Sequence, residues 1–127
     1  MILVDSSVWI EYFRGSSISV KKNVDELIDN NRLCTNDIIL LELIPPLIVK
    51  KQHPVVELLT IIHKLQMNIN WDEIVNFQIL NIKKGIYNVG IPDLMIVQNI
   101  IQNNAVLYTL DKHFYLMRKH LTFDLYT

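Results

Sequence analysis

Short apolar segments alternate along this chain with longer segments of helical periodicity, and this alternation restricts the fold more than any other feature. The apolar segments Ile2–Val4, Leu33–Thr35 and 105–109 predict buried strands. Apolar residues repeat at helical spacing over residues 20–28, between the first two strands, which predicts an amphipathic helix. Strands that alternate with helices predict an α/β fold with a parallel sheet covered on both faces.

The remaining segments fit the same alternation. A helix is expected to begin near Asn36, and Pro45 and Pro46 should break or sharply kink it, because proline lacks the backbone donor and clashes with the preceding turn. Further helices are predicted at residues 8–13, 54–65, 71–84, 93–102 and 112–120, and further strands at 67–69 and, at an edge, 122–125.

Length and composition favour one domain over residues 1–127, since half of the residues are hydrophobic and no long linker is evident. Cys34 is the only cysteine, so we expect a small buried residue of a strand and no internal disulfide. Neither a signal peptide nor a membrane span is predicted, and the expected location is therefore the cytoplasm.

The net charge of −1 neither supports nor excludes binding of nucleic acid. Pairs of basic residues such as Lys83–Lys84 are more readily explained as solvated helix faces. If RNA is the substrate, a bound metal ion would supply much of the positive charge.

Four carboxylates stand in positions that suggest chemistry. Asp5 and Asp111 follow apolar strands, and the carboxyl ends of parallel strands are where ligands bind in such folds. Glu42 and Asp93 lie in otherwise apolar surroundings, where a lone carboxylate is costly unless it is paired or binds a metal. Oxygen ligands of this kind suit Mg²⁺ or Mn²⁺.

Each of these acids also has a purely structural interpretation. Asp5 and Asp111 can be helix caps or turn residues at strand ends. Glu42 can point into solvent from one exposed position of its helix, and Asp93 can favour the helix dipole. The functional hypothesis therefore depends on the four acids taken together. A carboxylate-bound Mg²⁺ would polarise a phosphate and activate a water, and a free carboxylate would orient or deprotonate that water.

At these residues the chain resembles the PIN-domain family, and within it the VapC-type ribonuclease toxins. The resemblance is carried by four segments that span the chain in order: residues 4–15 with Asp5, 35–43 with Glu42, 91–96 with Asp93, and 108–114 with Asp111.

The resemblance implies a PIN-like three-layer α/β/α fold, with a central parallel sheet of about four to five strands. It implies an endoribonuclease dependent on Mg²⁺ or Mn²⁺, the toxin of a toxin–antitoxin pair, with a cognate antitoxin and a homodimer. Asp5 and Asp93 match the usual metal ligands, Glu42 and Asp111 complete the acidic pocket, and Ser6 and Thr109 match hydroxyl residues that line it. Pro45–Pro46 and Leu94–Met95 depart from the family pattern.

Two other functions remain open at this point. An aspartyl-phosphate enzyme of the haloacid-dehalogenase type would also use Asp5, as a nucleophile, but it needs a second acid where Ser7 stands. A catalytically inactive PIN-like module would bind RNA or protein, although the presence of all four acids favours an enzyme.

Overall fold

Strands and helices alternate through residues 1–127, all of which the computed structural model describes. The five strands are β1 (Ile2–Val4), β2 (Leu33–Thr35), β3 (His63–Lys64), β4 (Val106–Tyr108) and β5 (Asp124–Leu125). The seven helices are α1 (Ser6–Arg14), α2 (Ile18–Asp29), α3 (Asp37–Val49), α4 (His53–Ile61), α5 (Trp71–Lys83), α6 (Ile91–Gln102) and α7 (Lys112–Leu121).

The strands form one sheet in the order β3-β2-β1-β4-β5, and every pair in it is parallel. The chain moves outward from β1 to β3, returns to β4 on the other side of β1, and ends at β5. The order therefore reverses between β1 and β4, where Val4 is in register with Tyr108. Such a switch point is where open α/β sheets bind ligands, outside the carboxyl ends of the strands.

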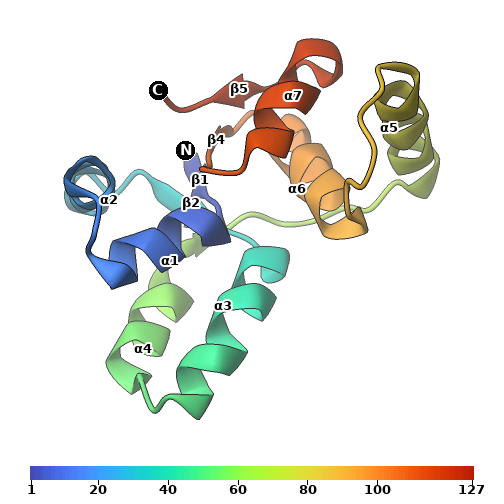
Figure 1. Cartoon of the computed structure of the whole chain (residues 1–127). Helices are drawn as coiled ribbons and strands as arrows, with labels where there is room; N and C mark the ends of the chain where they lie inside the picture. The colour runs from blue at the N-terminus through green and yellow to red at the C-terminus, as the bar shows by residue number, and fades with distance from the viewer.

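Helices lie on both sides of this sheet, which confirms the predicted three-layer α/β/α fold. In Figure 1, α1 to α4 lie to the left of and below the strands, and α5 to α7 lie to the right. A cluster of 29 buried hydrophobic residues joins the layers, and the three residues of β1 are completely or almost completely buried within it. The sheet thus holds the end of β1 rigidly in the middle of the molecule.

Helix α3 differs from its prediction because it continues through Pro45 and Pro46 to Val49. The two prolines cannot donate to the carbonyls one turn earlier, those of Leu41 and Glu42. Because all four residues are exposed, solvent can take the place of the missing donors. Of the two expected effects of the prolines, a break or a sharp kink, the break was therefore wrong.

The segment before α5 also differs from its prediction. Helix α4 ends at Ile61 instead of extending to residue 65, and the third strand is β3, while residues 67–69 form no strand. Side-chain amides of α6 hold this segment instead. Asn99 donates to the Gln66 carbonyl at 3.0 Å, and Gln102 donates to the Asn68 carbonyl at 2.7 Å. Hydrogen bonds from the side chains of α6 thus hold this segment in place of the backbone hydrogen bonds that a strand would make.

Cys34 is completely buried in β2 as predicted, and burial raises the pKa of its thiol to about 11. A thiol with such a pKa is an unreactive packing residue at neutral pH. None of the helices combines the length and the apolar character needed to cross a membrane.

Candidate active site

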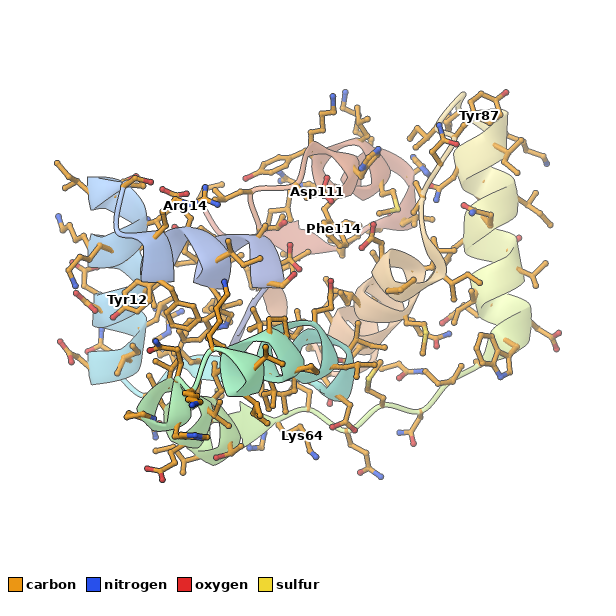
Figure 2. The ribbon with its side chains drawn as sticks, turned by 60° about the horizontal axis from the view of Figure 1, so that its bottom comes forward. Tyr12, Arg14, Lys64, Tyr87, Asp111 and Phe114 are labelled. Carbon is orange, nitrogen blue, oxygen red and sulfur yellow. The ribbon has the colours of Figure 1, made fainter.

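Adjacent strand ends bring the first and last segments of the chain together. Asp5 follows β1 directly, and its backbone N–H donates to the Tyr108 carbonyl of β4 at 2.9 Å. Thr109 and Asp111 follow β4 in the same way. Figure 2 shows Asp111 near Phe114 at the beginning of α7. Asp5 and Asp111 therefore lie at the same edge of the sheet, as predicted.

Asp5 is a buried carboxylate, with only 5% of its surface exposed. Its Oδ2 accepts hydrogen bonds from Ser7 Oγ at 2.7 Å and from Thr109 Oγ1 at 2.8 Å. No backbone N–H of α1 donates to the carboxylate, so Asp5 does not cap that helix. Since both bonds fall on Oδ2, Oδ1 has no hydrogen-bond donor within the chain and is available to a ligand.

The two hydroxyls are themselves oriented by the backbone. The Leu110 N–H donates to Ser7 Oγ at 3.1 Å, and the Asp111 N–H donates to Thr109 Oγ1 at 3.0 Å. Each hydroxyl has one hydrogen, which it uses toward Asp5. The Ser7 and Thr109 oxygens, 3.4 Å apart, therefore share no hydrogen bond of their own.

The predicted role of Thr109 beside the acidic pocket agrees with this geometry, whereas Ser6 contacts a different acid of the pocket. Ser6 Oγ donates to Glu42 Oε2 in a long contact of 3.4 Å. Ser7 was missed, although a second hydroxyl two residues after Asp5 was a visible signal for it. Its position on the first turn of α1 turns it toward β4.

Glu42 is an exposed residue of α3, as one of its two interpretations allowed, and it lines a largely apolar groove. Its carboxyl group nevertheless has limited contact with water, and this desolvation raises its pKa. The negative charges of Asp5 and Asp93 raise that pKa further, while the bond from Ser6 lowers it. Glu42 thus belongs electrostatically to the same cluster as the two aspartates.

Asp93 stands in the first turn of α6 and is half-buried. Burial raises its pKa to about 6, and the charges of Asp111 and Asp5 add to the increase, while His113 acts in the opposite direction. Asp93 is therefore coupled to Asp5 and Asp111 in addition to lying at the beginning of α6.

Asp111 is partly a structural residue, because its Oδ1 accepts from the His113 N–H at 2.9 Å and so caps α7. The same oxygen lies 3.1 Å from His113 Nδ1. His113 was not predicted as a site residue. Its position two residues after Asp111 places the imidazole beside the acidic cluster, where it acts electrostatically on Asp93.

The donor chemistry fits a divalent cation, although the side chains do not form a finished metal site. No three His, Cys, Asp or Glu side chains are close enough together to hold a metal ion. The carboxylates repel one another at longer range, as the raised pKa values of Glu42 and Asp93 show. A cation would relieve this repulsion, and Asp5 Oδ1 is free to bind it.

A groove of about 420 Å³ runs between α1 and α3, and Glu42 is one of its lining residues. Its walls are largely apolar, with Arg14 and Lys50 as the cationic groups. Figure 2 labels Arg14 at the end of α1. The other lining residues are Ile10, Phe13, Leu43, Pro46 and Leu47.

Comparison with solved structures finds close likeness over whole chains. VapBC2 from Rickettsia felis, solved bound to a DNA fragment from its promoter, is 19% identical with a TM-score of 0.76, covering 99% of this chain and 98% of that one. VapBC-1 from nontypeable Haemophilus influenzae is 24% identical with a TM-score of 0.71, covering 98% of both. FitAcB from Neisseria gonorrhoeae is 18% identical with a TM-score of 0.72, covering 100% and 97%. At these identities the likeness establishes the fold.

Comparison with curated protein sequences finds no match. The family model of the PIN domain, in contrast, matches residues 2–119, which include all four acids. The chain therefore belongs to the PIN domain family.

Proposed function

We propose that this chain is a divalent-metal-dependent endoribonuclease and the toxin of a type II toxin–antitoxin pair, acting in the cytoplasm. The observation that carries the proposal is the group of four acids around the β1–β4 switch point, two of which have raised pKa values. Membership of the PIN domain family and the fold shared with VapBC2 from Rickettsia felis support it.

In this proposal Asp5 and Asp93 hold the metal ion. A bound Mg²⁺ or Mn²⁺ would neutralise charge on the scissile phosphate and lower the pKa of a water. Ser7 and Thr109 hold Asp5 so that one oxygen stays free. Protonation of Asp93 would remove a ligand, and its pKa of about 6 leaves it mainly ionised at neutral pH.

Glu42 and Asp111 have a different role, because their carboxylates are left to accept a proton from, or to orient, the attacking water. Glu42 suits proton transfer because it is exposed and has a raised pKa. Asp111 is held more firmly, since its Oδ1 is bonded to the beginning of α7.

Two protein partners belong to the proposal. Glu42 lines the groove between α1 and α3, so a cognate antitoxin that occupied this groove would block access to Glu42. A homodimer is proposed as well.

The second candidate is a PIN-like module that binds RNA or protein without catalysis. It is favoured by one observation, namely that no three potential ligands are close enough together to hold a metal. Such a module needs no metal-dependent cleavage, so one experiment separates the two candidates.

The experiment compares induced expression of the wild type, Asp93→Asn and Asp124→Asn in bacteria. Asp124 is an exposed acid of the edge strand β5 and serves as the matched control. We expect growth arrest and discrete new RNA ends with the wild type and the control, and neither with Asp93→Asn. With the purified proteins, cleavage should stop when EDTA removes the metal and resume with Mg²⁺ or Mn²⁺. Cleavage that persists in Asp93→Asn, or no cleavage by soluble wild type, would contradict the proposal.

A further inference from the structure

Helices α5 and α7 contact each other, and a pocket of about 270 Å³ lies between their carboxyl-terminal ends. Its lining residues are Lys84, Ile86, Leu116, Lys119 and His120, and none of them is acidic. We call it the basic pocket. In Figure 1, α5 and α7 lie at the upper right, whereas α1 and α3 lie lower in the view. The basic pocket shares no residue with the groove that Glu42 lines.

The cations of the basic pocket have no acidic partners. The ion pairs within the chain involve other residues, so Lys84 and Lys119 are unpaired. Helix α7 contains neither Asp nor Glu. Burial lowers the pKa of His120, and the charge of Lys84 lowers it further, so these two basic groups are close enough to repel each other. An anion in the pocket would relieve this repulsion.

The location at two helix ends does not fully explain these cations. Cations are favourable in the last turn of a helix, where the dipole leaves a partial charge of about −0.5. Two helix ends therefore account for about one positive charge. The lysine and arginine residues in or next to the lining exceed this number: Lys83, Lys84, Arg118 and Lys119. The surplus is of the kind that phosphate-binding surfaces carry.

His120 is held in one orientation at the pocket wall. Its Nε2 lies 2.6 Å from Oδ1 of Asn81, a completely buried residue of α5. Because Asn81 Nδ2 donates to Gln78 Oε1 at 3.2 Å, the oxygen of the amide faces the imidazole. An amide oxygen only accepts, so Nε2 carries a hydrogen. The other ring nitrogen, Nδ1, has no partner in the chain, and once protonated it can donate to an anion.

One face of α7 connects the basic pocket to the acids. This helix begins directly after Asp111 and rises by about 1.5 Å per residue, so Lys119 lies about 12 Å from Asp111 along the axis. Lys112, Leu116 and Lys119 are spaced at i, i+4 and i+7 and therefore lie on the same face. A stacked strand with one phosphate per about 3.4 Å covers this distance in about three to four nucleotides. One strand can thus reach both places.

We propose that the basic pocket binds a backbone phosphate of the RNA strand, about three to four nucleotides from the phosphodiester at the acids. Lys84 and Lys119 neutralise this phosphate, and protonated His120 donates to it through Nδ1. The pocket would hold the substrate against the repulsion of the four acids. That the ligand is RNA rests on the proposed function, whereas the binding itself requires neither metal nor cleavage.

The test measures binding of the full-length protein to a labelled single-stranded RNA of about twelve nucleotides by fluorescence anisotropy, in EDTA and over a range of salt concentrations. Lys84→Gln and Lys119→Gln should each weaken binding by about three- to tenfold at low salt and reduce the salt slope by about 0.7. Lys119→Arg keeps the charge and should bind as the wild type does. Lys22→Gln, at an exposed lysine of α2 without an ion pair, is the matched control and should change neither quantity.

NMR of the His120 imidazole separates a strand from free phosphate, with His120→Gln identifying its signals. RNA should shift these signals at far lower concentrations than inorganic phosphate does. A response to inorganic phosphate alone would overturn the proposal, and so would a wild type that does not bind RNA. Lysine variants of the pocket that bind no more weakly than Lys22→Gln would overturn it as well. None of these results contradicts the proposed nuclease, whose own test is cleavage, and loss of cleavage with intact binding at the pocket would contradict the nuclease alone.

Discussion

Thr109 donates a hydrogen bond of 2.8 Å to Asp5 across the gap between β4 and β1, joining two residues that are 104 positions apart. The bond links the first acidic segment of the chain to the last. Its donor is almost completely buried, so water cannot replace it. The position of the Asp5 carboxylate therefore depends on the pairing of two strands that are distant in sequence.

Thr109→Val keeps the shape of the side chain and removes this donor. We expect a loss of about 1.5–3 kcal/mol in the free energy of unfolding, because the lost bond was made to a charged group. Cleavage should fall as well, since Asp5 is then held by Ser7 alone. Urea denaturation and an RNA-cleavage assay measure the two effects. Thr60→Val is the control, because its hydroxyl donates only to the Glu57 carbonyl on an exposed helix, and it should cost less than about 0.5 kcal/mol. Equal costs for the two substitutions would contradict the argument.

The general position of the site could be predicted because it depends on local patterns. A buried strand followed by an aspartate occurs twice, at Asp5 and Asp111, and parallel strands bring their carboxyl ends to one edge. Asp93 was found because an acid beside Pro92 opens an apolar helix. These features need no knowledge of how distant helices pack.

Other details depend on packing, and the sequence could not resolve them. Whether Ser6 or Ser7 reaches Asp5 is decided by the rotation of α1, since adjacent helical residues differ by about 100° in direction. For Glu42 the apolar neighbours in sequence left both a buried and a solvent-facing position open, and the packing of α3 leaves its side exposed. Helix α3 can likewise continue through Pro45 and Pro46 because this part of it is exposed, and local sequence does not reveal that exposure.

The loop before α5 illustrates the same limit, and it gives a second prediction. Asn99 of α6 accepts a hydrogen bond from Asn36 Nδ2 at 2.9 Å and donates to the Gln66 carbonyl. Asn99→Leu would leave the buried Asn36 amide without its partner and release the loop. We expect a loss of about 2–4 kcal/mol in the free energy of unfolding. Gln102→Leu removes a similar bond, to the Asn68 carbonyl at an exposed position, and should cost under about 1 kcal/mol. A cost for Asn99→Leu no larger than this control would show that the buried amide pair contributes little.

The raised pKa of Asp93 predicts how the stability of the metal-free protein changes with pH. Since the folded pKa of about 6 exceeds the ordinary 3.8, the folded state binds more protons between these values. The free energy of unfolding should therefore fall as pH rises from about 4 to about 6. Taken at full value, this difference in pKa would lower the free energy of unfolding by about 3 kcal/mol. Because Asp93 is only half-buried, solvent screens its interactions, and we expect a fall of about 1 kcal/mol. Urea denaturation across this range should show the fall in the wild type and in Asp124→Asn. A slope unchanged in Asp93→Asn would contradict the assignment to Asp93.

His113 yields a last prediction, because it acts on two acids at once. Its Nδ1 lies 3.1 Å from Asp111 Oδ1, and its charge lowers the pKa of Asp93. In His113→Asn the Asp93 pKa should rise, since one opposing charge is lost while the repulsion from Asp5 and Asp111 remains. The acid limb of the plot of cleavage rate against pH should then move to higher pH. Below neutrality the rate should fall by about two- to tenfold, because an increase of up to about one unit in the pKa of Asp93 lowers its ionised fraction by up to about tenfold. His53→Asn, at an exposed histidine of α4, should leave the profile in place. A purely structural role of His113 would lower the rate equally at every pH, so only a displaced acid limb supports an electrostatic link between His113 and Asp93.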